Sequence, residues 1–222
     1  MGQAYRIDRI NLITYPGKRK KIIQSCRCRY LAKSHIVNCS AKGQTFDFVN
    51  FRGSIFTKVK VNFEKATISG CDFWGVTFNE CDFTEANISD CVFMACKFRN
   101  CTFSNTHFNY TTIVNTALNE CKNIDISFGV KILTEYPKCT LTDELTDALT
   151  VVKNDRNLKK CKLLFISDTK YNELNLFLLL RRFTARELAD LLLEVCKHST
   201  STITTYKKLE RQLKKAKECA II

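Results

Sequence analysis

The chain has 222 residues, of which 45% are hydrophobic, so it is long enough to bury a continuous core in one or two domains. Its 35 Lys and Arg residues outnumber its 22 Asp and Glu residues, and the net charge of +13 favours a polyanionic neighbour, either nucleic acid or an anionic membrane surface. Apolar runs fall short of the ~18 residues that a membrane span needs, which excludes a membrane-spanning protein and leaves peripheral contact.

The N-terminal segment carries a concentration of the positive charge. Residues 1–33 contain nine Lys and Arg residues against Asp8 alone. No charged stretch followed by an apolar core is found there, so a secretory signal peptide is not expected, and the thirteen cysteines are interpreted as reduced thiols in a cytosol. We predict that residues 1–40 form a basic cap on the segment that follows.

A period of five residues dominates the segment 41–121. From Phe63 to Leu118 a large apolar residue stands at every fifth position, and two residues before each stands a small one such as Ala66, Cys71 or Val76. This period fits neither a helix nor a strand, so neither element would bury all these side chains on one face. It fits a solenoid in which each pentapeptide forms one side of a square coil, both apolar positions point inward, and residues twenty apart stack.

Upstream of Phe63 the spacing continues in another phase. Phe46, Phe51 and Phe56 keep the interval of five, two residues out of step, with a weaker continuation at Ile36 and Ala41. We therefore predict one more coil, joined through a two-residue insertion near residues 60–62.

The pattern resembles the pentapeptide-repeat family, in which a small residue precedes Leu or Phe by two positions. That resemblance implies a right-handed quadrilateral β-helix, which gives the predicted fold class: a mainly β solenoid followed by an α-helical C-terminal module. In this register Cys71 stacks on Cys91 and Cys81 on Cys101. Because Phe rings fill the shaft and the thiols project from successive walls, small buried filler is favoured over a metal or redox site, and no metal ligand is predicted.

Helix signals replace the five-residue period after a predicted linker at 122–140. Thr142 precedes a helical pattern, residues 168–182 are interpreted as a second helix, and Thr184 with Glu187 forms a capping box. We expect three or four helices within a module at 141–205. By resemblance to relatives it would be a C-terminal cap and a homodimerisation element; the alternative is a module that binds a specific partner.

The last segment, 206–222, is a basic amphipathic helix that ends in a four-residue motif. One face of the helix is apolar and carries Tyr206, Leu209, Leu213 and Ala216. Six basic residues lie outside that face: Lys207, Lys208, Arg211, Lys214, Lys215 and Lys217. The final residues Cys219, Ala220, Ile221 and Ile222 match the C-a-a-X box, the signal for an isoprenoid thioether on the cysteine. We predict lipidation of Cys219, with geranylgeranyl favoured by the bulky Ile222, and no other cofactor. The basic residues would add attraction to an anionic membrane.

Pentapeptide repeats are mostly bacterial and this kind of prenylation is eukaryotic, so the combination resembles secreted effectors of intracellular bacterial pathogens. The resemblance implies a scaffold that a host prenyltransferase modifies, that lies on the cytosolic face of a host membrane, and that binds a host protein. Two alternatives stay open. One is a nucleic-acid-related protein, either a DNA mimic, although residues 63–118 have a net charge of only −3, or a basic DNA-binding protein. The other is a bacterial cytosolic scaffold without lipid.

No catalytic constellation is visible in the sequence, and we expect no enzymatic activity. The three histidines, His35, His107 and His198, lie far apart, and His107 takes an outward position of the repeat. A nucleophile at Cys139 or Cys161 paired with one of them is the remaining catalytic hypothesis.

Overall fold

The computed structural model describes residues 21–37, 39–57, 61–198 and 202–220. The chain divides into two compact units: the first ends at Thr134 and the second begins at Glu135. The first unit is the solenoid and the second is helical. The predicted four-sided parallel solenoid followed by helices is therefore confirmed.

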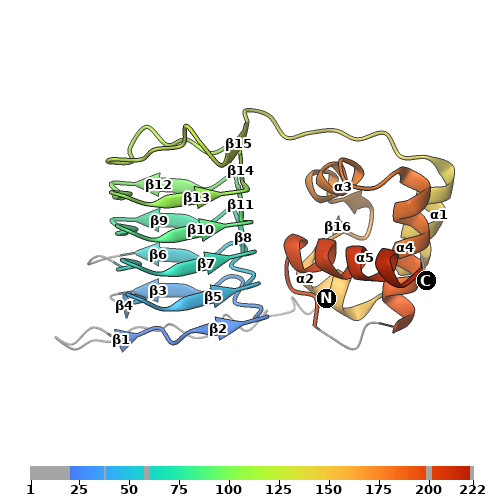
Figure 1. Cartoon of the computed structure of the whole chain (residues 1–222), viewed down its shortest axis with the longest axis horizontal. Helices are drawn as coiled ribbons and strands as arrows, with labels where there is room; N and C mark the ends of the chain where they lie inside the picture. The colour runs from blue at the N-terminus through green and yellow to red at the C-terminus, as the bar shows by residue number, and fades with distance from the viewer. Residues whose placement is uncertain (1–20, 38, 58–60, 199–201, 221–222) are drawn as a thin grey trace, which may run out of the picture. The chain divides into compact units, whose positions relative to one another are not determined.

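Short strands from successive coils stack into parallel sheets on three faces of the solenoid (Figure 1). One face contains β2 (Cys26–Arg27), β5 (Thr45–Asp47), β7 (Thr67–Ser69), β10 (Asn87–Ser89) and β13 (His107–Asn109). A second contains β8 (Asp72–Trp74), β11 (Val92–Met94), β14 (Thr111–Val114) and β15 (Val130–Leu133). A third contains β3 (His35–Val37), β6 (Ile55–Thr57), β9 (Thr77–Asn79) and β12 (Lys97–Arg99).

The fourth face is held by single bridges instead of strands. It begins with the paired strands β1 (Lys21–Ile22) and β4 (Cys39–Ser40), and isolated parallel bridges then join Ser40, Asn62, Asp82, Thr102 and Lys122 in order. Each pentapeptide thus spans one side of a square coil, as the period of five requires.

Register along the stack confirms the predicted insertion. Between Thr67 and His107 each strand pairs with the residue twenty positions away. In the preceding coil, Phe46 pairs with Ile68 and Phe56 pairs with Phe78, so the offset between paired residues is twenty-two. The two extra residues therefore lie between Phe56 and Val61, and residues 58–60 are outside the described part of the chain.

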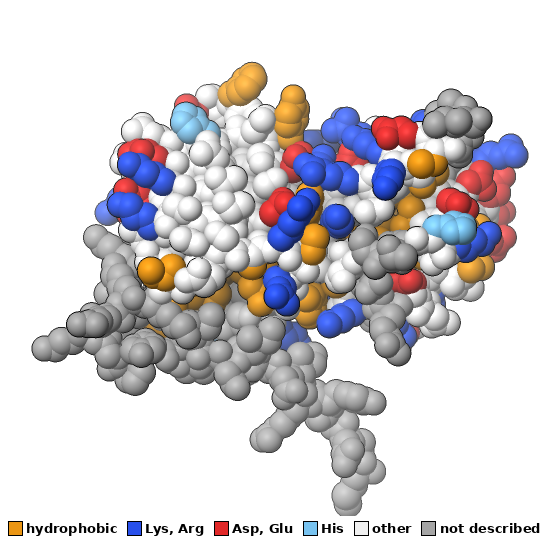
Figure 2. All heavy atoms as spheres, turned by 60° about the horizontal axis from the view of Figure 1, so that its bottom comes forward, with side chains coloured by type: hydrophobic (Ala, Val, Ile, Leu, Met, Phe, Trp, Pro, Cys, Tyr) orange, Lys and Arg blue, Asp and Glu red, His pale blue; other side chains and the backbone are white. Residues whose placement is uncertain are grey.

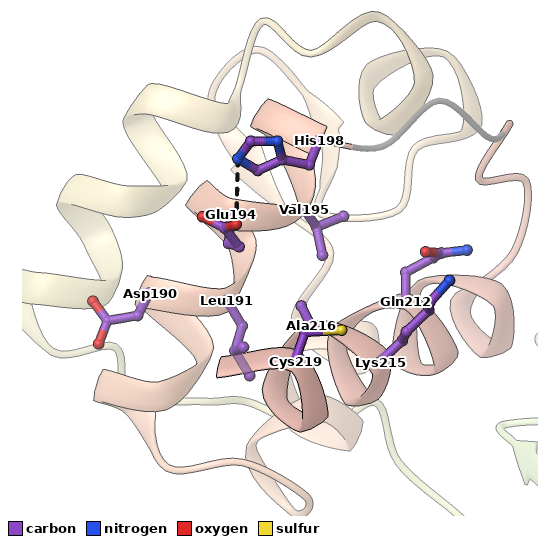
Figure 3. Close-up of a pocket in the computed structure, with 9 residues that line it drawn as sticks. All are labelled: Asp190, Leu191, Glu194, Val195, His198, Gln212, Lys215, Ala216 and Cys219. Carbon is purple, nitrogen blue, oxygen red and sulfur yellow. Dashed lines mark ion pairs between the residues drawn. The ribbon is translucent and has the colours of Figure 1, made fainter. Parts of the chain in front are cut away.

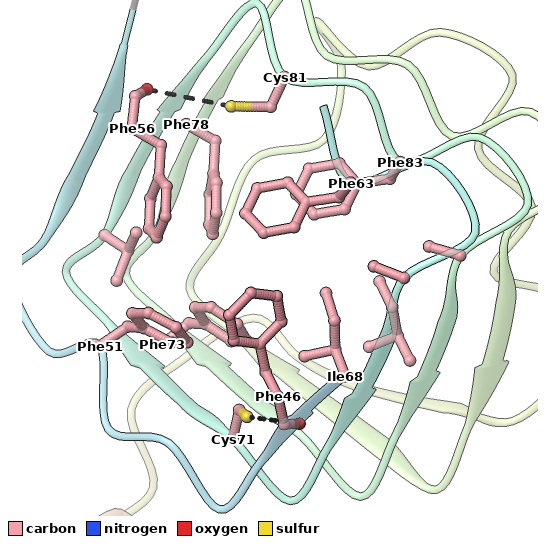
Figure 4. Packing of buried hydrophobic residues seen from close by; sticks show 14 of the residues in the cluster. Phe46, Phe51, Phe56, Phe63, Ile68, Cys71, Phe73, Phe78, Cys81 and Phe83 are labelled. Carbon is pink, nitrogen blue, oxygen red and sulfur yellow. Dashed lines mark hydrogen bonds between the residues drawn. The ribbon is translucent and has the colours of Figure 1, made fainter. Parts of the chain in front are cut away.

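Stacked aromatic rings fill the shaft (Figure 4). The rings of Phe63, Phe83 and Phe103 form one column, with centroids 4.8 Å and 4.7 Å apart and nearly parallel planes. The small position before each ring is also buried: Cys71, Cys81, Cys91 and Cys101 are at most 1% exposed. These four thiols belong to the buried core cluster that the Phe rings form.

The solenoid is longer than the predicted segment 41–121 at both ends. Residues 21–40, assigned by sequence to a cap, contribute β1 to β4, and β2 and β3 pair with β5 and β6 of the next coil. At the other end, β15 extends the second face within the predicted linker, where it pairs with β14. Residues 1–20, the other half of the predicted cap, lie outside the described residues.

The second unit contains five helices within its described residues: α1 (Asp143–Val152), α2 (Arg156–Cys161), α3 (Glu173–Leu180), α4 (Ala185–His198) and α5 (Tyr206–Ala220). Helix α4 packs against both α1 and α5. The predicted helix at 168–182 is wrong in its first turn, because β16 (Phe165–Ser167) and β17 (Lys170–Tyr171) form an antiparallel hairpin there. Asn172 then caps α3 by accepting from the backbone N–H of Asn175.

Candidate functional site

Helix α5 carries the residues that the sequence singled out, and its apolar face is used for packing. The helix begins after Thr205, whose hydroxyl oxygen accepts from the backbone N–H of Lys208. Leu209 and Leu213 are fully buried and Tyr206 is 8% exposed, so this stripe is part of the core of the second unit. Because the apolar face is occupied, α5 in this fold presents its polar face outward and has no apolar stripe to insert into a lipid surface.

The six basic residues differ in their surroundings. Arg211, Lys214 and Lys215 are exposed, whereas Lys207, Lys208 and Lys217 are partly buried. Lys207 and Lys214 each place Nζ 2.8 Å from a carboxylate oxygen of Glu210, and Lys217 Nζ lies 2.8 Å from Glu187 Oε1. Lys207, Lys214 and Lys217 are thus each paired with an acidic residue of the same unit.

Glu210 is the centre of a buried ionic cluster. Its side chain is 2% exposed and also lies 3.8 Å from Nε of Arg182 at the end of α3. Burial by itself would raise the pKa of this carboxyl, but hydrogen bonds from Lys207 and Lys214 outweigh that effect and lower it. Glu210 is therefore an anion held mainly by two lysines of its own helix, with Arg182 as its contact outside α5.

A second ionic contact joins α5 to the start of α4. The Thr184 N–H donates to Glu187 Oε2 at 2.8 Å, and the Glu187 N–H donates to Thr184 Oγ1 at 3.2 Å, which is the reciprocal capping box that the sequence predicted. Lys217 adds an ion pair to the same carboxylate, and its hydrogen bond, followed by those from Thr184, lowers the pKa of Glu187 to about 2.

Cys219 differs from the other twelve cysteines because it is exposed. It lies in the last turn of α5, one residue before Ala220, the final residue of the helix. Ile221 and Ile222, the remainder of the four-residue motif, are outside the described residues. The thiol of Cys219 is therefore presented on the surface beside the basic face of α5.

Cys219 also lines a groove between α4 and α5, shown in Figure 3. The groove has a volume of about 500 Å³. Its other lining residues on α4 are Asp190, Leu191, Glu194, Val195 and His198, and those on α5 are Gln212, Lys215 and Ala216. The sequence does not predict this groove, because a helical pattern identifies the buried stripe of each helix but not the gap between two helices.

The hypothesis of a cysteine nucleophile gains no support from the geometry. Cys161 is buried, and burial, followed by the charge of Glu173, raises the pKa of Cys139, which disfavours the reactive thiolate. The contacts found for the histidines are with other groups: His198 lies 3.3 Å from Glu194, and His35 contacts Thr57. Among the described residues, no group of three or more His, Cys, Asp and Glu side chains is arranged to hold a metal ion.

The face of the molecule shown in Figure 2 carries charges of both signs. In the view of Figure 2, Lys and Arg side chains alternate with Asp and Glu and do not gather into one broad basic surface. Within the residues described, no helix is long and apolar enough to cross a bilayer.

Comparison with known proteins identifies the repeats. The family model for pentapeptide repeats matches residues 59–94 and 86–122, with eight copies in all. Among curated proteins, no sequence matches this chain.

Solved structures of pentapeptide repeat proteins resemble the chain at low identity. A pentapeptide repeat protein from the Arabidopsis thaliana thylakoid lumen is 18% identical with a TM-score of 0.34, and the match covers 70% of this chain and 88% of that one. QnrB1, a plasmid-mediated fluoroquinolone resistance protein, is 16% identical with a TM-score of 0.27, over 61% of this chain and 72% of that one. Rfr23, a pentapeptide repeat protein from the cyanobacterium Cyanothece 51142, is 12% identical with a TM-score of 0.20, and the match covers 46% of this chain and 59% of that one. Likeness at these identities concerns the fold alone.

Proposed function

We propose that this pentapeptide-repeat protein is a non-enzymatic scaffold that an isoprenoid on Cys219 holds at an anionic membrane, where it binds another protein. A host prenyltransferase would attach the lipid, after delivery of the protein from a bacterium into a eukaryotic cell. The observation that carries the proposal is the position of Cys219, the exposed thiol at the end of a helix whose polar face is basic. The proposal requires Ile222 to carry the free carboxylate, because the C-a-a-X signal is read at the extreme terminus.

The lipid and the helix have complementary parts in this proposal. A single lipid chain gives marginal, reversible membrane binding, and a second signal is needed for stable anchoring. Arg211 and Lys215 are exposed on α5 close to Cys219 in sequence, and a basic residue near an anionic leaflet contributes about 1 kcal/mol. Lys207, Lys214 and Lys217 contribute less, since each is paired with a carboxylate. The isoprenoid therefore supplies the apolar contact that the buried face of α5 does not.

The direct experiment is the intact mass of the chain after expression in eukaryotic cells. We expect the isoprenoid added to Cys219, residues 220–222 removed and the new terminus methylated. Cys219→Ser should abolish the mass change and release the protein from membranes, whereas Cys196→Ser, at a half-buried cysteine of α4, should leave both unchanged. Extension of the chain by one residue after Ile222 should act like Cys219→Ser. An unmodified wild-type mass would overturn the proposal.

The electrostatic part is tested on the lipidated protein. Arg211→Glu combined with Lys215→Glu reverses two exposed charges and should weaken binding to phosphatidylserine vesicles, most strongly at low salt. Binding to vesicles of neutral lipid is the control and should change little. Equal loss on both kinds of vesicle would show that α5 does not act through its charge.

A further inference from the structure

The groove between α4 and α5 combines an apolar floor with polar edges. Leu191 and Val195 from α4 and Ala216 from α5 face one another across it in Figure 3. Leu191 and Val195 are 7% and 5% exposed, so little of either side chain remains in contact with water. Five polar residues complete the lining: Asp190, whose carboxylate is directed away from α5, Glu194 and His198, which pair at 3.3 Å, and Gln212 and Lys215 on α5. A concave site that combines apolar contacts with polar groups is typical of a small-molecule site.

Cys219 is part of the wall of this groove. A group attached to its sulfur would therefore start inside the groove and need no linker to reach the floor. The effective concentration of such a tethered group is far higher than that of a free ligand. This position separates Cys219 from the other cysteines, of which none lines the groove.

The size of the groove suits one isoprenoid. A hydrocarbon carbon with its hydrogens occupies roughly the 30 Å³ that a water molecule takes up in the liquid. A chain of 15 to 20 carbons then needs on the order of 450–600 Å³ by that measure, against about 500 Å³ in the groove. The groove is therefore large enough to take up a folded farnesyl or geranylgeranyl chain.

We propose that the isoprenoid on Cys219 folds back into the groove between α4 and α5, which gives a second state in which the lipid is withheld from the membrane. The inference rests on the proposed lipidation of Cys219. After removal of residues 220–222 the modified cysteine is the last residue, so no chain follows it to obstruct the fold-back. Membrane binding then requires the lipid to leave the groove, and whatever occupies the groove shifts the protein towards the membrane.

Substitutions at Ala216 test the fold-back state, because this residue is half-buried and its side chain points into the groove. Ala216→Trp fills the space, and Ala216→Gln makes the floor polar without adding an aromatic ring that could itself bind lipid. The lipidated proteins, with the modification confirmed by intact mass, are sedimented with phosphatidylserine vesicles. Transfer of one methylene from water shifts an equilibrium about fourfold. A fold-back state that buries only two methylenes is therefore favoured more than tenfold. Loss of that state should raise the affinity for vesicles by the same factor.

Two controls isolate the lipid. Val151→Trp places the same ring at a residue of α1 that is 69% exposed, outside the groove, and should leave vesicle affinity unchanged. Ala216→Trp combined with Cys219→Ser should not bind vesicles. Lipidated wild-type protein should also be a monomer in sedimentation velocity without vesicles, because the lipid lies in its own groove.

The outcomes separate this inference from the proposed function. A chain without an isoprenoid overturns both. Lipidated protein whose vesicle affinity is the same in wild type and in both Ala216 variants overturns the fold-back state alone. Dimers that form only when Cys219 is lipidated, and that Ala216→Trp abolishes, would place the lipid in the groove of a second copy and overturn the intramolecular form of the proposal.

Discussion

At the scale of single residues, Glu210 shows that lysines of a basic helix can be engaged by a carboxylate of the same helix. The carboxylate is buried, and its desolvation is offset by Lys207 and Lys214 at 2.8 Å, with Arg182 farther away. Such a cluster is strongly destabilised when one partner is removed, because an uncompensated buried charge remains. The six basic residues of α5 are therefore not equivalent, although their sequence spacing suggests one continuous surface.

We expect Glu210→Gln to lower the free energy of unfolding of the helical unit by about 2–4 kcal/mol, since it leaves Lys207 partly buried without its anion. Urea unfolding followed by far-UV circular dichroism measures the change. Glu218→Gln, at an exposed residue of the same helix, is the matched control and should stay within about 0.5 kcal/mol of wild type. Equal effects of the two substitutions would contradict the role of the buried cluster.

The stability of the helical unit should also depend on acid pH. The pKa of Glu187 is lowered from 4.5 to about 2 in the fold, and that of Glu210 is lowered as well. A carboxyl with a depressed folded pKa binds protons more readily in the unfolded chain, so its contribution is complete above pH 4.5 and is lost as pH falls towards 2. We expect the melting temperature to fall in this window.

Glu187→Gln should flatten the acid dependence, because the substituted side chain no longer titrates. Glu194→Gln, an exposed carboxyl on the same helix, is the control and should leave the slope close to that of wild type. A pH profile unaffected by Glu187→Gln would show that the capping box and its ion pair with Lys217 do not contribute.

At the scale of elements, the solenoid depends on rings that stack between coils. Phe83 lies between Phe63 and Phe103 and is 1% exposed. We expect Phe83→Ala to lower the free energy of unfolding by about 3–5 kcal/mol, because it removes the ring contacts with Phe63, Phe78 and Phe103 and leaves a cavity that neighbouring coils do not fill. Phe128→Ala, at a ring that is 86% exposed, should cost less than about 0.5 kcal/mol. Urea unfolding with tryptophan fluorescence compares the two.

The corners of the coil carry a conformational cost that a substitution should relieve. Every fifth residue from Glu80 to Asn115 has a positive φ, including Ala95 at +50°. An L-residue in the left-handed region is strained and glycine is not, so Ala95→Gly should raise the free energy of unfolding by about 0.5–1 kcal/mol. Ala86→Gly, at a buried small position with no positive φ, should lower it. A loss of stability from both substitutions would contradict this account of the corners.

The small position of the repeat has a second role that its size alone did not predict. Thr106 Oγ1 donates to the carbonyl oxygen of Phe83 at 2.7 Å, and Cys96 Sγ donates to that of Phe73 at 3.0 Å. Cys and Thr at this position thus satisfy a backbone acceptor of the coil below while they fill the shaft. Burial raises the pKa of Cys96 to about 12, which leaves it a neutral thiol suited to that role.

At the scale of the whole molecule, each of the two units has its own buried core and its own spectroscopic probe. Trp74 is the single tryptophan of the chain and lies in the solenoid unit, where Arg52 stacks on its ring at 4.0 Å. The far-UV helix signal comes from the second unit. We expect Phe83→Ala to lower the urea midpoint measured by fluorescence and to leave the midpoint measured by circular dichroism unchanged. Glu210→Gln should lower the midpoint measured by circular dichroism and leave that measured by fluorescence unchanged. Coincident shifts of both probes would contradict separate unfolding of the units.

The extent of the solenoid was predictable where its period is unbroken and not where the phase changes. Lys21 pairs with Cys39, an offset of eighteen, while Cys26 pairs with Phe46 at twenty, so two residues are missing between these strands. Together with the insertion after Phe56 this breaks the period on both sides of the segment 26–56, which explains why residues 21–40 resembled a cap. The hairpin before α3 was missed because its short strands carry the same polar and apolar residues as a first helical turn.

The sequence by itself determined the solenoid, because a repeat of five has no other regular structure that buries both of its apolar positions, and it identified the capping box and the composition of α5. Tertiary structure decided what those residues face. Whether a lysine on α5 meets water or a carboxylate depends on residues far away in the chain, such as Glu187, or buried within the same helix, such as Glu210. The groove beside Cys219 likewise exists only because α4 and α5 pack with a gap, and no local pattern records the distance between two helices.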